Sequence, residues 1–261
     1  MNIAIIGAGS MGGGIARALA ATGQYDVTVS NPSVPKLDAI KAEYPAVTVT
    51  TDNVEAVVNA DIVILAVKPW LLATVIEQIK PRLVYRRHSI VSLAGGVSLD
   101  EIDKMLLRGD ELPATFRVIP NTALSAGKSM TFVAARRASE ALTASVADMF
   151  APMGSVAVIE ERLMDAATAL SSCGIAYVYK FVQAMVQAGV QLGFRPADAL
   201  RYANATVEGA AAMLSQPGAL PQQEIDKVTT PGGMTIKGVN SLEHTGFASS
   251  VITAILSPLG K

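Results

Sequence analysis

The glycine-rich stretch at the start of the chain is the feature that most constrains its fold. Asn2–Ile6 is a short apolar run rich in isoleucine, and segment 15–21 has helical character. Between them stand Gly7, Gly9 and Gly12, at the spacing Gly-x-Gly-x-x-Gly. In this pattern one glycine makes a tight turn, one lets the backbone approach a pyrophosphate, and one lets helix and strand pack closely. Because the motif lies between a strand and a helix, it predicts a dinucleotide-binding βαβ unit rather than a glycine turn without a ligand.

Strand and helix patterns alternate to about residue 160, after which only helical patterns follow. We therefore expect an α/β protein, with an N-terminal Rossmann-type doubly wound sheet at 1–160 and a C-terminal all-helical domain at 161–261. The expected strands are 2–6, 26–29, 47–50, 61–67, 89–93, 115–119, 130–134 and 156–158, and the expected helices are 15–21, 53–59, 71–79, 98–107, 138–150, 163–170, 175–192, 196–214, 222–227, 235–244 and 247–256.

Composition restricts the partners and the compartment. The net charge of −1 provides no basic field for nucleic acid or an anionic membrane, so we expect a small-molecule substrate instead. A single cysteine, Cys173, excludes an intramolecular disulfide and suits a reducing compartment. We see neither a signal peptide nor a run of about 18 apolar residues, and expect a cytoplasmic protein.

The residues after the second strand bear on the choice of cofactor. An NAD enzyme of this type places a carboxylate there for the ribose 2′-hydroxyl, whereas this chain has Ser30, Asn31, Pro32 and Ser33. Hydroxyl and amide donors without a carboxylate favour NADPH, with NADH possible, although the arginine typical of 2′-phosphate sites is missing. The alternative is that these residues form only a turn.

Ligands of open α/β sheets bind at the carboxyl ends of the strands, which places further residues at the cofactor. The strand expected at 61–67 ends with Ala66 and Val67 and is followed by Lys68 and Pro69. Two other strands are followed by Ala94-Gly95 and by Asn121. The predicted cofactor-binding residues are Gly7, Gly9, Ser10, Met11, Gly12, Asn31, Ser33, Ala66, Val67, Lys68, Pro69, Ala94, Gly95 and Asn121.

The helix expected at 175–192 is apolar over most of its circumference. Its polar residues Lys180, Gln183, Gln187 and Gln191 form one narrow stripe. Such a helix must be buried on several sides, so we expect a second subunit to cover it and the protein to be a homodimer. A compact monomeric bundle with this helix at its centre is the alternative.

The small number of acid–base, nucleophilic and metal-binding residues restricts the reactions that this chain can catalyse. His88 and His244 stand beside no plausible nucleophile or carboxylate pair, and we expect both at the surface. No residues have metal-ligand spacing, so no metal is predicted, and no Gly-x-Ser-x-Gly elbow is present. A nicotinamide enzyme with little acid–base equipment suits a cyclic imine, whose protonated form is already electrophilic.

The segment 228–243 supplies a candidate substrate site. Thr230, Pro231, Gly232 and Gly233 are expected to form a tight turn, and Thr235 to cap the helix that follows. Several backbone N–H groups would then converge at a helix N-terminus, which suits a carboxylate. An ordinary capped helix start is the alternative.

Motifs along the whole chain carry a resemblance to one family. They are GxGxMG at 7–12, AVKP at 66–69, IPNTA at 119–123, the helix start at 171–189, TTPGGMT at 229–235 and Leu242-Glu243. On these residues the chain resembles the Δ1-pyrroline-5-carboxylate reductases. The resemblance implies NAD(P)H-dependent reduction of pyrroline-5-carboxylate to L-proline, in proline biosynthesis, by an oxidoreductase.

The resemblance also implies residue roles and an assembly. Thr230, Gly232, Gly233 and the amide of Thr235 would bind the substrate carboxylate, and the Thr235 hydroxyl would act in catalysis by hydrogen-bonding the ring nitrogen. Asn53 would join the cofactor-binding residues at the adenosine ribose or its phosphate. The helical domain would bind substrate and interlock two chains into a dimer, with decamers as larger assemblies.

Departures from the family pattern leave two other hypotheses open. Cys173 and Ile175 replace the usual Ser and Pro, and Ala123 replaces a Pro. Lys180, followed by Gln183, also resembles the 3-hydroxyacid dehydrogenases, whose catalytic Lys is followed three positions later by Asn. A non-catalytic nucleotide-binding regulator is the third hypothesis, although the chain has no DNA-reading element or basic patch.

Overall fold

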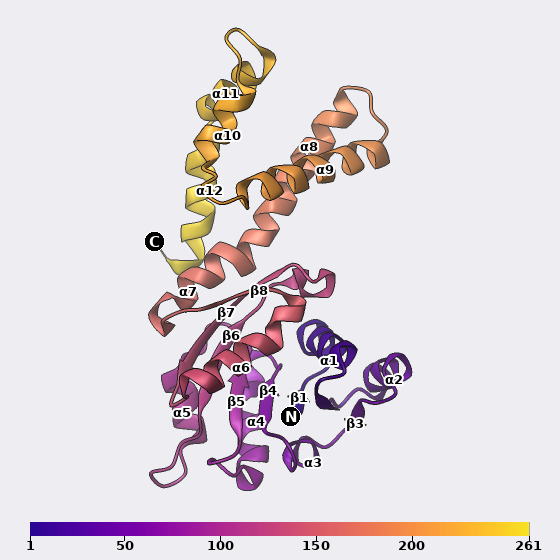
Figure 1. Ribbon diagram of the computed structural model, residues 1–261, viewed down its shortest axis with the longest axis vertical. Helices are drawn as coiled ribbons and strands as arrows, with labels where there is room; N and C mark the ends of the chain where they lie inside the picture. The colour runs from indigo at the N-terminus through magenta and orange to yellow at the C-terminus, as the bar shows by residue number, and fades with distance from the viewer. Residues whose placement is uncertain (261) are drawn as a thin grey trace. The chain divides into compact units, whose positions relative to one another are not determined.

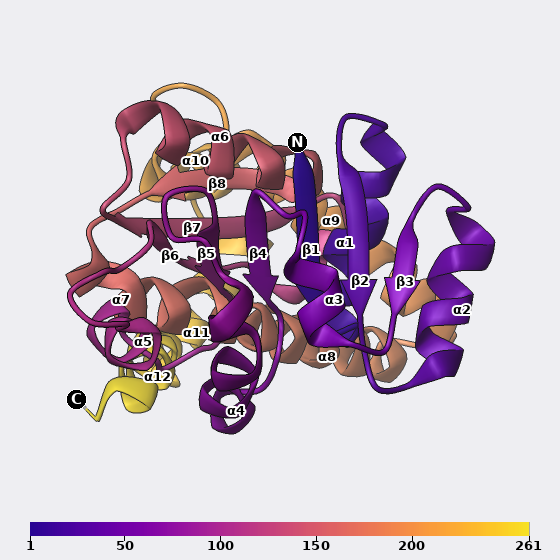
Figure 2. The same ribbon diagram turned by 90° about the horizontal axis from the view of Figure 1, so that it is seen from below.

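One twisted sheet organises the first part of the protein, as the computed structural model, which describes residues 1–260, shows (Figures 1 and 2). Within those residues the sheet has eight strands in the order β3-β2-β1-β4-β5-β6-β7-β8, and neighbours are parallel except β6 and β7. The predicted doubly wound α/β fold is therefore confirmed. The strands are β1 (Asn2–Ile6), β2 (Asp26–Ser30), β3 (Thr48–Thr50), β4 (Ile62–Leu65), β5 (Ser89–Ser92), β6 (Thr115–Ile119), β7 (Ser129–Arg136) and β8 (Gly154–Val158).

Helices cover both faces of this sheet, because alternate side chains of each strand point to opposite sides. Ile3 and Ile5 pack on one face with Ile15, while Ala4 and Ile6 pack on the other face. Full burial of each such isoleucine contributes about 1.5–3 kcal/mol. The first face carries α1 (Ser10–Thr22), α2 (Val34–Glu43) and α6 (Glu140–Phe150), and the second carries α3 (Asn53–Val57), α4 (Pro69–Ile79) and α5 (Leu99–Leu106).

Helix α2 was not predicted from the sequence. Only Leu37 and Ile40 are buried on it, so it lacks the repeated apolar stripe that marks an amphipathic helix. Pro35 stands in its first turn, where the missing N–H costs nothing. A proline start signal was present, but the surrounding turn residues obscured it.

The segment between the sheet and the last helices is more irregular than predicted. Instead of one helix over 163–170 it forms the short α7 (Met164–Ala167) and a π-helical turn, η5 (Thr168–Cys173). Short 3₁₀ turns occur at η1 (Lys80–Arg82), η2 (Thr122–Ala126), η3 (Ala151–Met153), η4 (Glu161–Leu163) and η6 (Ser257–Leu259).

The chain divides into two units, Met1–Ser172 and a helical unit from Cys173 onward. The first turns after β8 therefore belong with the sheet, and the domain division at residue 160 stays a prediction. The helical unit contains α8 (Gly174–Gln191), α9 (Pro196–Leu214), α10 (Pro221–Val228), α11 (Met234–His244) and α12 (Phe247–Leu256).

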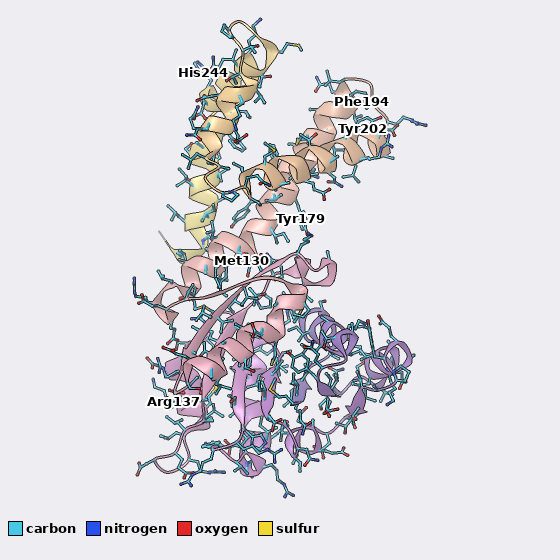
Figure 3. All side chains as sticks on the ribbon, viewed as in Figure 1. Met130, Arg137, Tyr179, Phe194, Tyr202 and His244 are labelled. Atoms are coloured by element: carbon cyan, nitrogen blue, oxygen red, sulfur yellow. The ribbon has the colours of Figure 1, made fainter. Side chains whose placement is uncertain are left out.

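Helices α8 and α9 form a closely packed hairpin. A Cβ added at Gly189 would lie only 3.0 Å from the Cβ of Ala199, so the glycine allows the two backbones to approach. At the turn between the helices the rings of Phe194 and Tyr202 meet edge to face, with centroids 5.5 Å apart (Figure 3). The hydroxyl of Tyr177 donates to the carbonyl of Ala254 at 2.8 Å and thereby ties α8 to α12.

The helical unit has almost no core of its own. Among its described residues only Ala199 and Ala203 are buried, and no residue of α8 is. Large apolar side chains such as Tyr179 and Ile252 stay exposed. Within residues 173–260 the helices therefore form no compact bundle around α8 and leave its apolar surface uncovered.

Among residues 1–260, no helix is both long enough and apolar enough to span a membrane.

Candidate functional site

A cavity of about 1050 Å³ opens at the carboxyl ends of the parallel strands. It lies where β1 and β4 are neighbours, which is the point at which the strand order reverses and open α/β sheets bind their ligands. Twelve of the predicted cofactor residues line it: Gly7, Gly9, Ser10, Met11, Asn31, Asn53, Ala66, Val67, Lys68, Pro69, Ala94 and Gly95.

The three glycines of the N-terminal motif have separate structural roles. Gly7 has a φ of +105°, and a Cβ there would lie 2.5 Å from the carbonyl oxygen of Ala66. A Cβ on Gly12 would lie 1.9 Å from the carbonyl oxygen of Gly7, so this position permits the close packing of α1. At Gly9, by contrast, an added Cβ would meet no described atom within 4 Å. Gly9 therefore leaves room for a ligand at the N-terminus of α1, where a pyrophosphate fits.

Three predicted cofactor residues do not line the cavity. Gly12 is a buried residue of the first turn of α1, and Ser33 is the N-cap of α2. The side chain of Asn121 accepts a hydrogen bond from the backbone N–H of Ala123 at 3.1 Å and donates one to the hydroxyl of Ser171 at 3.2 Å. Asn121 therefore holds the turn η5 against the end of β6.

The amide side chains at the β2 end of the cavity are largely engaged within the protein. Asn31 is buried, and its Oδ1 accepts from the N–H of Ala8 at 3.0 Å, which braces the glycine loop. The Ser30 hydroxyl donates to Asn53 Oδ1 at 2.7 Å, and Asn53 Nδ2 donates to Gln78 Oε1 at 3.0 Å. Asn31 and Asn53 thus shape this end of the cavity as well as lining it.

Two charged residues at this end were missed by sequence reasoning. Lys36, in the first turn of α2, and Asp52, before α3, both line the cavity. The predicted absence of a carboxylate concerned residues 30–33 after β2. Asp52, before α3, adds a carboxylate at the same end of the cavity, and its Oδ1 accepts from the N–H of Val54 at 2.7 Å. The signal for Lys36 was its position just after Pro35, but using it required helix α2 to be recognised.

The turn before α11 has the geometry of an anion site. Gly232 has a φ of +72°, and a Cβ on Gly233 would lie 2.5 Å from the Thr230 hydroxyl oxygen. Gly233 is the N-cap of α11, so the first N–H groups of the helix receive no side-chain cap. The prediction that Thr235 caps the helix is wrong, because Thr235 is the second helical residue, where its own N–H is one of these uncapped donors.

The two histidines differ from each other. His244 is exposed at the end of α11, as predicted (Figure 3). His88 was expected at the surface and is 1% exposed. Its Nδ1 accepts from the N–H of Val84 at 2.8 Å, and its Nε2 lies 2.9 Å from the carbonyl oxygen of Val57. Backbone partners explain the burial of a polar ring in a basic stretch.

Two other features limit the chemistry. Within residues 1–260 no group of three or more His, Cys, Asp or Glu side chains is placed to hold a metal. Lys180 lies exposed on α8, and its Nζ donates to Gln183 Oε1 at 2.8 Å.

Models of known protein families match both parts of the chain. The pyrroline-5-carboxylate reductase dimerisation model matches residues 161–258, and the model for coenzyme F420-dependent NADP oxidoreductases matches residues 2–96. Pyrroline-5-carboxylate reductase 2 of Dictyostelium discoideum is 35% identical over 98% of this chain and 90% of its own length. The chain spans only about half the length, 49%, of pyrroline-5-carboxylate reductase 1 of the same organism, to which it is also 35% identical.

Solved structures agree over the whole chain. A pyrroline-5-carboxylate reductase from Coxiella burnetii is 31% identical, with a TM-score of 0.90 over 99% of this chain and 96% of that one. The Plasmodium falciparum enzyme with NADP bound is 26% identical, with a TM-score of 0.87 over 99% and 95%. From this likeness in sequence and fold over nearly its full length, the chain belongs to the pyrroline-5-carboxylate reductase family.

Proposed function

We propose that the protein reduces 1-pyrroline-5-carboxylate to L-proline with NADPH, as a step of proline biosynthesis. The turn before α11 carries this proposal, because it combines uncapped helix N–H groups with the left-handed backbone of Gly232 and the close approach of Gly233 to Thr230. Such a turn suits the carboxylate of a small imine acid. The family relationship supports the same substrate.

The cavity in the first unit fits the cofactor. The space beside Gly9 admits a pyrophosphate, and residues at the ends of β2, β4 and β5 line the remainder. Bound there, the reduced nicotinamide would supply a hydride to the carbon of the substrate C=N bond. The nitrogen already carries its proton in the iminium form, so the product amine needs no further general acid.

The residues of the helical unit then have positioning roles. Thr230, Gly232, Gly233 and the amide of Thr235 hold the carboxylate, and the Thr235 hydroxyl hydrogen-bonds the ring nitrogen. Fixing a substrate in a near-attack orientation can account for a large share of a rate enhancement when the substrate is already electrophilic.

The proposal includes an assembly and a location. A homodimer would cover the exposed apolar side chains of α8 and α12, and dimers could assemble further into a decamer. The free thiol of Cys173 favours a reducing cytoplasm. The net charge of −1 favours neither nucleic acid nor a membrane as a partner.

No observation favours the 3-hydroxyacid dehydrogenase alternative. Lys180 is exposed and hydrogen-bonded to Gln183, and that alternative assigns no role to the turn before α11.

The test is oxidation of NADPH with pyrroline-5-carboxylate, run beside NADP⁺ reduction with a panel of 3-hydroxyacids. We expect turnover only with the imine. Turnover confined to the hydroxyacids would overturn the proposal.

A further inference from the structure

The end of the cavity formed by β2 and β3 is its polar end, and most of its polar side chains already have partners. The side chain of Asn31 is hydrogen-bonded to the N–H of Ala8, and that of Asn53 is hydrogen-bonded to the side chains of Ser30 and Gln78. The Asp52 carboxylate accepts from the N–H of Val54. Groups that satisfy the protein in this way are poorly placed to give up those bonds to a ligand.

Lys36 is different. Its backbone is fixed in the first turn of α2 by a hydrogen bond from its N–H to the carbonyl of Ser33 at 3.2 Å. Its side chain is exposed, and no hydrogen bond or ion pair engages its ammonium group within residues 1–260. The nearby Arg17, by contrast, is paired with Glu43 at 2.6 Å.

The distribution of charge around the cavity also distinguishes Lys36 from the other lining residues. Among the described lining residues the cations are Lys36 and Lys68, and Lys68 follows β4, on the other side of the glycine loop. At the β2 end the charged lining residues are therefore Lys36 and Asp52. A dianionic group bound at this end would be repelled by Asp52 and would need Lys36 to compensate.

We propose that Lys36 is the residue that selects NADPH over NADH, by pairing with the 2′-phosphate of the adenosine ribose. The assignment rests on the proposed function, since it assumes a nicotinamide dinucleotide in this cavity. A lysine ammonium binds phosphate as a compact point charge, so Lys36 fills the role for which the sequence lacks an arginine. Asn31 then acts on the glycine loop rather than on the phosphate.

The experiment compares two adenosine fragments that differ only in the phosphate. Adenosine 2′,5′-bisphosphate and adenosine 5′-monophosphate are titrated calorimetrically into the parent, Lys36→Met, Lys36→Arg and Lys128→Met proteins. Lys128 is exposed and lies outside the cavity lining, so its variant loses the same unit of charge elsewhere. NADPH and NADH affinities are measured in parallel.

We expect Lys36→Met to weaken the bisphosphate and NADPH by about ten- to a hundredfold, the range for a hydrogen bond to a charged group. Its affinity for the monophosphate and NADH should change less than about twofold. Lys36→Arg should retain the preference, and Lys128→Met should bind as the parent does. Because Asp52 remains, salt should weaken the bisphosphate more in the parent than in Lys36→Met.

Two results would overturn the assignment, and they are distinguishable. If the parent oxidises NADPH with pyrroline-5-carboxylate but Lys36→Met keeps the full preference, or loses both fragments equally, Lys36 does not read the 2′-phosphate and the proposed function survives. If the parent binds neither fragment nor NADPH, the proposed function fails and the assignment fails with it.

Discussion

The side-chain amide of Asn121, at the end of β6, donates a hydrogen bond to the hydroxyl of Ser171 in the π-helical turn η5, at 3.2 Å. A second bond, from the Ser172 hydroxyl to the carbonyl of Pro120 at 3.1 Å, runs beside it. Strand β6 neighbours β5, and the residues that follow β5 line the cofactor cavity. π-Helical turns are often found at functional sites, and these bonds fix this one to the segment that follows β6.

Replacing Asn121 should therefore cost stability. Asn121→Ala removes bonds to both Ser171 and the N–H of Ala123, and we expect a loss of about 1–3 kcal/mol in the free energy of unfolding. Ser171→Ala removes only one bond and should cost less, about 0.5–1.5 kcal/mol. Urea unfolding of both variants and of the double variant measures the coupling. Additive effects would show that the two side chains do not interact.

The buried ring of His88 should contribute more to the stability of the fold than Asn121 does. The bonds to Val84 and Val57 fit the neutral tautomer with its proton on Nε2. His88→Leu leaves the buried N–H of Val84 unpaired and removes one of the two hydrogen bonds to the Val57 carbonyl, which still accepts from Ala60. It should lower the free energy of unfolding by about 2–4 kcal/mol. Arg86→Ala, at an exposed neighbour, is the matched control and should change it by less than about 0.5 kcal/mol. Equal effects of the two substitutions would contradict the role of His88.

Ionisation of Tyr85 should make the stability of the protein depend on pH in the alkaline range. Burial raises the pKa of its phenol above the ordinary value of 10.0, against the opposing charge of Arg108. The folded state therefore holds the proton more tightly, so this stabilisation is complete below about pH 10 and is lost as the pH rises through the folded pKa. Tyr85→Phe lacks this ionisation and the bond to Leu106. We expect the parent to be more stable than Tyr85→Phe at pH 8, with the gap shrinking above pH 10 in thermal unfolding. A gap that grows with pH would refute the assignment.

A substitution at Val186 tests whether a second subunit covers α8. It lies on α8, which has no buried residue within the chain. If a partner covers this helix, Val186→Asp would place an unpaired charge in an apolar interface and cost several kcal/mol, which should dissociate or unfold the protein. Gln187→Asp, on the exposed polar stripe, should leave the oligomer intact. Light scattering at micromolar concentration measures both, and a monomeric parent would remove the premise.

The sequence predicted the elements whose local signals agree with their tertiary setting. Helix α9 begins at Pro196 and β6 ends directly before Pro120, so both were predicted with the observed bounds. The π-helical turn was missed because one inserted residue hardly alters the apolar pattern around 168–173. Asp52 and Lys36 reach the cavity only once β3 and α2 have folded beside β2. His88 is buried because the distant carbonyl of Val57 meets its Nε2 while the nearby N–H of Val84 meets its Nδ1. Such placements depend on tertiary neighbours that no local pattern encodes.

The most direct test of the proposed chemistry compares two single substitutions. Thr235→Ala removes the hydroxyl assigned to the ring nitrogen, and Lys180→Met removes the amine that a hydroxyacid dehydrogenase would use while keeping most of its volume. With NADPH and pyrroline-5-carboxylate, we expect Thr235→Ala to lower turnover roughly ten- to a hundredfold, equivalent to about 1.5–3 kcal/mol, and Lys180→Met to change it far less. The contradicting result is a Lys180→Met protein that is folded, binds NADPH and is inactive, while Thr235→Ala retains the parent's turnover.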